Sequence, residues 1–368
     1  MDKNELRLIK ELRHQLHQHP EVSNFESWTK SHLMDFIQEY TSLEIIDKGK
    51  WFYVAYRSNK ASKNIAFRAD FDAIQMEEVM DLDYASCNPG VSHKCGHDGH
   101  AAVLCGLALE IEKEQPDQNI FLLFQHAEET GEGAKECQVI IEAEQIDEIY
   151  AFHNMSDIRL KTVKVIKGVS HYASKGMELL FEGKQAHASQ PELGVNPSYA
   201  IAKIIRFLDE YVHTSDSDLL CTIVHVNVGE RAFGVSPSHG RLALTIRAKN
   251  EQALNNLQIT IEQLATDFAV KDSLKTHFKC FDVFPETVNT DMACRRVIEV
   301  CNSLGLDVVG GQPYRASEDF GYYTKQTEGA IFYVGNGFDY PDIHTTEFDF
   351  NDDIIETAVS IFKELTKN

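Results

Sequence analysis

The sequence predicts an α/β protein in which a central mixed sheet flanked by helices is interrupted by an inserted α+β domain. The chain has 368 residues, of which 43% are hydrophobic, enough to bury two cores. Short β-rich runs alternate with helical segments toward both ends of the chain, which is typical of an α/β sheet. In the middle the order becomes strand, helix, strand, strand, helix, strand, which indicates a split βαβ, ferredoxin-like unit.

The first part of the chain opens with two helices. Apolar residues recur at helical spacing from residue 6 to residue 16, until Pro20 stops the pattern, and 28–37 shows a similar pattern. Strands and helices then alternate. The predicted strands are 43–46, 52–56, 65–68, 120–124 and 149–152, and the predicted helices between them are 101–113 and 132–143.

The inserted part begins near residue 172. Its predicted elements are strand 177–181, helix 197–211, strands 219–228 and 241–247, helix 251–268 and strand 276–281. After Pro285 the first pattern resumes with helix 292–304, strand 330–334 and helix 354–365. The sequence therefore predicts one domain made of 1–171 and 285–368, and an inserted domain over 172–284.

The composition argues against several classes of partner. There are 57 acidic and 35 basic residues, which give a formal charge of −22. This charge repels nucleic acid and anionic membrane surfaces. No apolar run approaches the roughly 18 residues that a transmembrane helix needs. The start of the chain lacks a signal-like pattern, and eight cysteines are scattered through it, so we expect a cytoplasmic protein.

Side chains able to bind metal collect where predicted strands end. In an open α/β sheet several such loops converge on one crevice. The candidate residues are Arg68, Asp70, Asp72, Cys95, His97, Asp98, Glu128, Glu129, His153 and His344.

The densest cluster is Cys-Gly-His-Asp-Gly-His at 95–100. A thiolate and an imidazole separated by one glycine can both face a borderline-soft ion, because glycine allows a tight path of the loop. Taken alone, the cluster would be better explained by a buried cysteine beside a helix-capping Asp98.

Glu128 and Glu129 follow a strongly apolar strand. Adjacent carboxylates at a buried strand end repel each other unless a cation offsets the repulsion. If one carboxylate binds the metal, its neighbour can move protons, as a hydrolase requires. The alternative is a solvated acidic turn. His153 and His344, each unremarkable alone, bring the donors to about the number that two divalent ions need.

Together these motifs resemble the metal-dependent aminoacylase and carboxypeptidase-like amidohydrolases, in the branch with hippurate hydrolases, auxin-conjugate hydrolases and N-acetyldiaminopimelate deacetylases. The resemblance covers nearly the whole chain. It is carried by His-Gln-His-Pro-Glu (17–21), Arg-Ala-Asp-Phe-Asp-Ala (68–73), Cys-Gly-His-Asp-Gly-His (95–100), Ala-Glu-Glu (127–129), Gly-Lys-Gln-Ala-His-Ala (183–188), Ser-Glu-Asp-Phe (317–320) and His-Thr-Thr-Glu-Phe (344–348).

The resemblance implies a two-metal centre with zinc by ligand type, or with manganese, cobalt or nickel. The implied ligands are Cys95, His97, Glu129, His153 and His344. Glu128 would be general base and then general acid. Asp70 would orient one of the metal ligands by a hydrogen bond, without binding the metal itself. His187 would reach a neighbouring active site, usually that of the other subunit of a homodimer, and stabilise the oxyanion. The inserted domain would be lid and dimerisation domain, and the other domain would be catalytic.

The sequence departs from the family pattern at a few positions. Gln75 and His126 stand where proline is common, and Gly234 stands where the family usually has an asparagine near the polar end of the substrate. Glycine has no side chain to donate that hydrogen bond, so carboxylate recognition is either weaker or moved to Arg231 or Arg241. The alternative for these two arginines is an ordinary surface charge. The segment 317–320 either supports the cleft or contacts substrate. The remaining assignments are buried thiols for Cys105 and Cys137, and no ligand role for His100, His126, His171 and His239.

The predicted function is that of a dinuclear-metal amidohydrolase that cleaves the amide bond of small N-acyl amino acids. A metallo-dipeptidase or carboxypeptidase acting on short peptides is the alternative, since it uses the same centre and differs only in the pocket. A metal-binding protein without turnover is a third possibility. Glu128 argues against it, because storage of a metal needs no unligated carboxylate beside the site.

Overall fold

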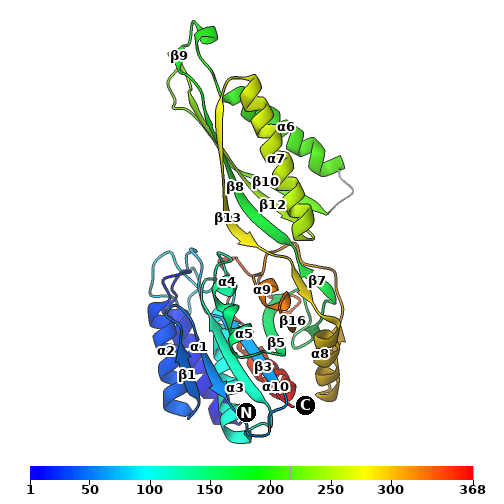
Figure 1. Cartoon of the computed structure of the whole chain (residues 1–368). Coiled ribbons are helices and arrows are strands. Elements are labelled where there is room, and N and C mark those ends of the chain that lie inside the picture. Colours follow the sequence, from blue (N-terminus) through cyan, green and yellow to red (C-terminus); the bar gives the residue numbers. More distant parts are fainter. Residues whose placement is uncertain (215–217, 368) are drawn as a thin grey trace. The chain divides into compact units, whose positions relative to one another are not determined.

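A computed structural model describes residues 1–214 and 218–367, which form two compact units (Figure 1). The first comprises Met1–Ser170, Thr287–Pro313 and Glu318–Asn368. The second comprises His171–Glu286 and Tyr314–Ser317. The sequence placed the insertion at 172–284 and did not include the short segment 314–317 in it.

The first unit is built on an eight-stranded mixed sheet with the order β1-β2-β4-β3-β5-β16-β6-β15. Its strands are β1 (Glu44–Asp47), β2 (Phe52–Tyr56), β3 (Asn64–Asp70), β4 (Asn119–Gln125), β5 (Glu148–Ser156), β6 (Val163–Lys164), β15 (Val308–Val309) and β16 (Glu328–Gly337). The central strands β4, β3, β5 and β16 run parallel to their neighbours in that series. The predicted mixed sheet is therefore confirmed.

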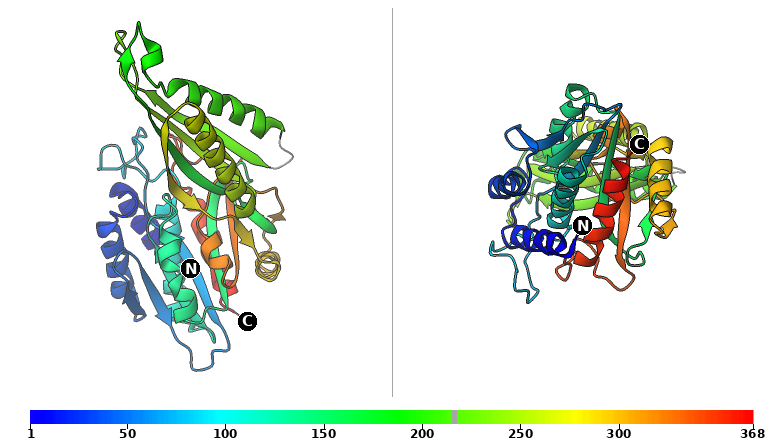
Figure 2. Two further views of the ribbon diagram at one scale, coloured as in Figure 1. Left: turned by 45° about the horizontal axis from the view of Figure 1, so that its top comes forward. Right: turned by 90° about the horizontal axis from the view of Figure 1, so that it is seen from below.

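Helices cover both faces of this sheet because its strands are apolar on both faces (Figure 2). In β3, Phe67 joins one core and the adjacent Ala66 joins the other. The first core includes α1 (Lys3–Gln18), α2 (Ser27–Tyr40), α3 (His97–Glu114), α8 (Asp291–Ser303) and α10 (Ile355–Leu365). The second includes α4 (Gly133–Cys137), α5 (Val139–Ala143) and α9 (Gly321–Thr324).

Two helices of the first unit differ from the prediction. The single helix predicted over 132–143 is two short helices that meet at Gln138, whose side chain donates to the Lys135 carbonyl. Helix α3 begins at His97, four residues before the predicted start. The metal-binding motif 95–100 thus lies at a helix start rather than in a loop.

The second unit is a four-stranded antiparallel sheet with the order β10-β12-β8-β13. Its elements are β8 (Ala173–Glu182), α6 (Ser198–Thr214), β10 (Leu219–Val228), β12 (His239–Ala248), α7 (Glu251–Lys271) and β13 (Lys275–Phe284). Leu242, Leu244 and Ile246 alternate along β12 and face the core shared with α6 and α7. The predicted ferredoxin-like insertion is confirmed.

Several short elements were not predicted. Besides β6, β15 and α9, they are β7 (Gly168–His171), β14 (Thr287–Asn289), β9 (Ala186–His187), β11 (Val235–Ser236), and the 3₁₀ turns η1 (Pro191–Leu193) and η2 (Asp352–Ile354). Among the residues described, no helix is both long and apolar enough to span a bilayer.

Candidate metal centre

Five side chains with metal-binding atoms lie together in the first unit, although they come from four separate segments. They are Cys95, His97, Glu129, His153 and His344. Cys95 Sγ lies 3.4 Å from His153 Nε2, and His344 Nε2 lies 3.4 Å from Glu129 Oε1. His97 Nε2 is 3.8 Å from the same Glu129 oxygen. The structure therefore brings together all five residues that the resemblance implied as ligands.

The glycine between Cys95 and His97 allows the tight path of this loop. Gly96 has φ +101°, and a Cβ there would lie 2.3 Å from Asn154 Oδ1. A side chain at this position would thus meet both backbone strain and a clash. Gly96 ends the loop, and α3 starts at His97. The side chains of Cys95 and His97 consequently flank the glycine and can both reach the cluster.

The other donors follow strands of the sheet or lie in the loop near the C-terminus. Glu128 and Glu129 come shortly after β4, whereas His153 lies within β5. Both β4 and β5 pair in parallel with β3. Parallel strands place their carboxyl ends at one edge of a sheet, where sites in α/β folds are built. His344 joins them because its backbone N–H donates to the Lys94 carbonyl at 2.6 Å.

Hydrogen bonds behind two of the imidazoles leave the Nε2 atoms free for ligation. His97 Nδ1 lies 2.9 Å from the Asp72 carbonyl oxygen and 3.1 Å from Asp72 Oδ1, and His153 Nδ1 lies 2.6 Å from the Asn154 carbonyl oxygen. A carbonyl oxygen can only accept, so both rings carry a proton on Nδ1. Nε2 is thus the atom of each ring that can bind an ion once it carries no proton.

Asp70 contacts a histidine that is not among the implied ligands. The resemblance implied that Asp70 orients a metal ligand, but the residue behind His97 is Asp72. Asp70 Oδ1 is 2.6 Å from His100 Nδ1, and the other nitrogen of His100 is 2.7 Å from Asn154 Oδ1. Since both nitrogens of His100 have partners, this ring has no free atom to offer an ion. Asp70 itself approaches His97 Nε2 only to 3.8 Å.

The electrostatics of the cluster fit bound cations. His97 Nε2 and Glu129 Oε1 are buried and have no hydrogen-bond partner in the part of the chain that the structure describes. Burial, with the charges of Glu318 and Glu129, holds the pKa of Glu128 well above its usual range. Burial also holds the pKa of His153 well below its usual range. A thiol, imidazoles and crowded carboxylates with unpartnered atoms are a suitable donor set for divalent ions.

A buried ionic network beside the cluster was not anticipated. Arg68 Nη1 lies 2.7 Å from Asp70 Oδ2, and Arg68 Nη2 lies 2.8 Å from Asp319 Oδ1 and 3.2 Å from Glu318 Oε1. Gln125 Nε2 also donates to Asp319, at 2.8 Å. The signal in the sequence was an arginine within an otherwise apolar strand, but its partners lie too far along the chain to be recognised.

In the second unit, His187 is exposed on β9, where it pairs with Val235 of β11. The Ser189 N–H donates to His187 Nδ1 at 3.2 Å, so Nδ1 is the acceptor and Nε2 carries the proton of the neutral ring. Gly234 accepts a hydrogen bond from the Ala188 N–H at 3.0 Å, and no atom lies within 4 Å of where its Cβ would be.

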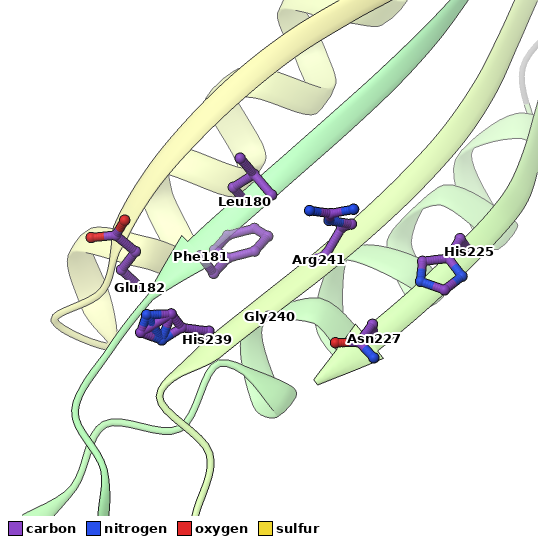
Figure 3. Close-up of a pocket in the computed structure, with 8 residues that line it drawn as sticks. All are labelled: Leu180, Phe181, Glu182, His225, Asn227, His239, Gly240 and Arg241. Carbon is purple, nitrogen blue, oxygen red and sulfur yellow. The ribbon is translucent and has the colours of Figure 1, made fainter. Parts of the chain in front are cut away.

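Of the two arginines named as alternatives for carboxylate recognition, Arg231 is exposed. Arg241 lies 3.2 Å from Glu178 Oε1 and helps to line a cavity of about 500 Å³ on the sheet of the second unit. Figure 3 shows Arg241 in that cavity with Asn227 and His225 on β10. Ser317 belongs to this unit and receives a hydrogen bond from Arg247 at 2.7 Å.

Comparison with known proteins agrees with this geometry. An N-acetyl-L-cysteine deacetylase from Bacillus subtilis is 29% identical over 364 residues, which cover 97% of this chain and 86% of the relative. A hippurate hydrolase from Campylobacter jejuni is 27% identical over 366 residues, covering 97% of this chain and 95% of the relative.

A solved structure from Bacillus subtilis, a dinuclear metal-binding peptidase of the M20 family, is 25% identical with a TM-score of 0.84 and covers 99% of this chain and 98% of that one. The model of peptidase family M20/M25/M40 matches residues 66–368. This match spans well over half of the sequence and confirms the predicted class of reaction, which is hydrolysis of an amide bond. The chain belongs to peptidase family M20/M25/M40.

Proposed function

We propose that the chain cleaves the amide bond of N-acyl amino acids in a centre that holds two divalent ions. The observation that carries this proposal is the gathering of a thiol, three imidazoles and the Glu129 carboxylate, with Glu128 buried beside them. Deacetylase and hippurate hydrolase activities, named for the relatives, fit the same chemistry. Hydrolysis of such amides needs activated water, a proton carrier and a donor to the oxyanion.

The five clustered residues would hold the ions, with Asp72 and the Asn154 carbonyl fixing the rings of His97 and His153. When bound, the ions supply Lewis acidity, which makes water more acidic and polarises the substrate carbonyl. The thiol and imidazole donors favour zinc over magnesium or calcium. Elemental analysis of the purified protein should find two zinc ions per chain, and manganese, cobalt or nickel in their place would correct the assignment.

Glu128 is the residue that moves protons. Its carboxylate accepts the proton of the attacking water and then returns it to the departing amine. Its placement supports this role, because Glu128 Oε2 lies 4.0 Å from His97 Nε2 and the carboxyl group is buried next to the donor cluster. Burial keeps bulk water from competing for the proton.

His187 supplies a hydrogen bond to the oxyanion. The Ser189 N–H occupies Nδ1, which leaves the exposed Nε2–H of the neutral ring as a donor. The first unit would then be the catalytic domain, and the second would be the lid and dimerisation domain of a homodimer. We expect His187→Ala to lower kcat at least tenfold while the metal content stays unchanged. Light scattering of the wild-type protein tests the dimer.

The experiment that tests the proposed function is Glu128→Gln assayed on N-acetyl, N-benzoyl and dipeptide substrates. Glutamine keeps the size of the side chain but cannot carry the proton, so turnover should fall by about 10³-fold or more. Unchanged hydrolysis would remove Glu128 from the mechanism. A clear preference of the wild-type enzyme for dipeptides would replace the deacylase with a dipeptidase.

The free thiols support a reducing cytoplasm as the place of action.

A further inference from the structure

Glu26 directly precedes α2 but does not cap this helix. Its side chain makes no hydrogen bond to the first turn of α2. Glu21 does this instead, and accepts from the N–H groups of Trp28 at 3.2 Å and Thr29 at 2.8 Å. Glu26 is only 5% exposed, so its carboxyl group points into the protein. The usual reason for an acid at a helix start is therefore absent here.

The partner of Glu26 is the backbone just before Glu128. Glu26 Oε1 accepts from the Ala127 N–H at 2.8 Å. Ala127 is fully buried and has φ +47°, a conformation that costs a non-glycine residue roughly 1 kcal/mol or more. The Ala127 carbonyl is held in turn by the Gly133 N–H at 3.0 Å. Both polar backbone groups of this strained residue are thus fixed.

Neighbours of Glu26 hold the other side of the same loop. Ser23 Oγ donates to Asp72 Oδ2 at 2.7 Å, and this oxygen also accepts from the Glu129 N–H at 3.1 Å. The Ala73 N–H donates to the Glu21 carbonyl at 2.8 Å, which fixes the segment 21–26 against the strand end that carries Asp72. The segment therefore contacts the chain before Glu128 directly, and is linked through Asp72 to the residue after it.

Glu26 occupies this position at an electrostatic cost. Burial and the nearby charge of Asp72 raise the pKa of Glu26 to about 7. An apolar side chain would avoid this cost, but it would leave the Ala127 N–H buried without an acceptor. The acid is thus explained by the hydrogen bond that it accepts.

We propose that Glu26 is a positioning residue for proton transfer. Through the Ala127 N–H it holds the strained backbone that aims the Glu128 carboxylate at the donor cluster. This inference rests on the proposed function, since it acts through Glu128. A backbone shift of about 1 Å at a catalytic group can lower the rate by about 100-fold without weakening substrate binding.

The test compares metal-loaded Glu26→Leu and Glu26→Gln with the wild type. Leucine has no acceptor, so kcat should fall by about 10- to 100-fold while KM stays within about threefold and the metal content is unchanged. The amide oxygen of glutamine can still accept from Ala127, so Glu26→Gln should keep kcat within about threefold. The matched control is Glu21→Ala, which removes the cap of the same helix and should lower Tm but not kcat.

Hydrogen exchange of the Ala127 amide gives a readout that does not depend on catalysis. The amide should exchange slowly in the wild type, Glu26→Gln and Glu128→Gln, and at least about tenfold faster in Glu26→Leu, because only that variant removes its acceptor.

The outcomes separate this inference from the proposed function. Wild-type kcat in Glu26→Leu, or a large loss of kcat in Glu26→Gln while the Ala127 amide stays protected, would overturn the positioning role. If Glu26→Leu does not fold, the kcat of Glu26→Gln together with the exchange rate of its Ala127 amide still tests the positioning role. If Glu128→Gln keeps its turnover, the proposed function fails, and hydrogen exchange alone then decides whether Glu26 holds Ala127.

Discussion

Arg68 Nη2 lies 2.8 Å from Asp319 Oδ1, an ion pair between two buried side chains that are 251 positions apart. Two further carboxylates, those of Asp70 and Glu318, contact the same guanidinium. Asp70, Glu318 and Asp319 thus share the guanidinium of Arg68, and Asp70 also contacts His100. The buried acids beside the donor cluster therefore meet at one arginine.

Arg68→Leu should destabilise the protein by about 3–5 kcal/mol, because it leaves three buried acids without their cation. Urea unfolding of the wild type and the variant measures the change. Arg57→Leu is the control, since Arg57 is half-exposed and its ion pair with Glu144 should contribute less than about 1 kcal/mol. Equal effects at both positions would contradict the importance assigned to the buried network.

Cys95→Ser should lower the metal content, because a serine hydroxyl is a far weaker ligand for zinc than a thiolate. We expect clearly fewer than two ions per chain by elemental analysis after dialysis. Cys87→Ser is the matched control, since the thiol of this exposed cysteine lies within hydrogen-bonding distance of His19 Nδ1, at 3.2 Å, and outside the donor cluster. Full metal content in Cys95→Ser would exclude the thiol from the ligand set.

Glu110 should contribute a pH-dependent part of the stability. Burial opposes its ionisation, but the Lys113 and Lys363 ammonium groups, each 2.6 Å away, lower the pKa of Glu110 to about 2. A folded pKa below the unfolded value means that this stabilisation is complete above about pH 5 and is lost as the pH falls toward 2.

Glu110→Gln should therefore cost about 1–2 kcal/mol at pH 7, with both lysines partly solvated, and progressively less at lower pH. Urea unfolding between pH 3 and 7 tests this. Glu114→Gln, which removes a more exposed partner of Lys363, should change stability by less than about 0.5 kcal/mol. A Glu110→Gln effect that does not depend on pH would contradict the assignment.

Gly133→Ala should destabilise the loop that carries Glu128. A Cβ at this position would lie 1.7 Å from the His126 carbonyl oxygen, so the backbone must move. We expect a loss of more than about 2 kcal/mol by thermal or urea unfolding, together with reduced activity. Gly310→Ala, where nothing lies within 4 Å of the added Cβ, should be nearly neutral.

The sequence predicted the central strands well because their composition is decisive. Strands 52–56 and 219–228 match β2 and β10 at both ends, and the apolar run of β4 is typical of a strand buried on both faces. The strands β6 and β15 have two residues each and carry no detectable pattern. The start of α3 was missed because Gly96 and Gly99 disfavour a helix, whereas in the structure Gly99 packs against the ring of Phe350.

The residues of the candidate site could be named from sequence motifs, but their contacts could not. Asp70 is the last residue of β3 and Asp72 lies two residues beyond it, and only the path of the folded chain decides which of them meets Nδ1 of His97. The hydrogen bond from Ala127 to Glu26 joins segments 101 positions apart. Side chains that meet across such distances leave no periodic signal.

The donor cluster draws on both ends of the first unit, with residues 171–286 between them in the chain. During synthesis Cys95, His97 and Glu129 leave the ribosome long before His344 does. A nascent chain thus presents only part of this donor cluster until the segment that carries His344 has been synthesised. The cluster is consequently assembled from segments that become available at well-separated times.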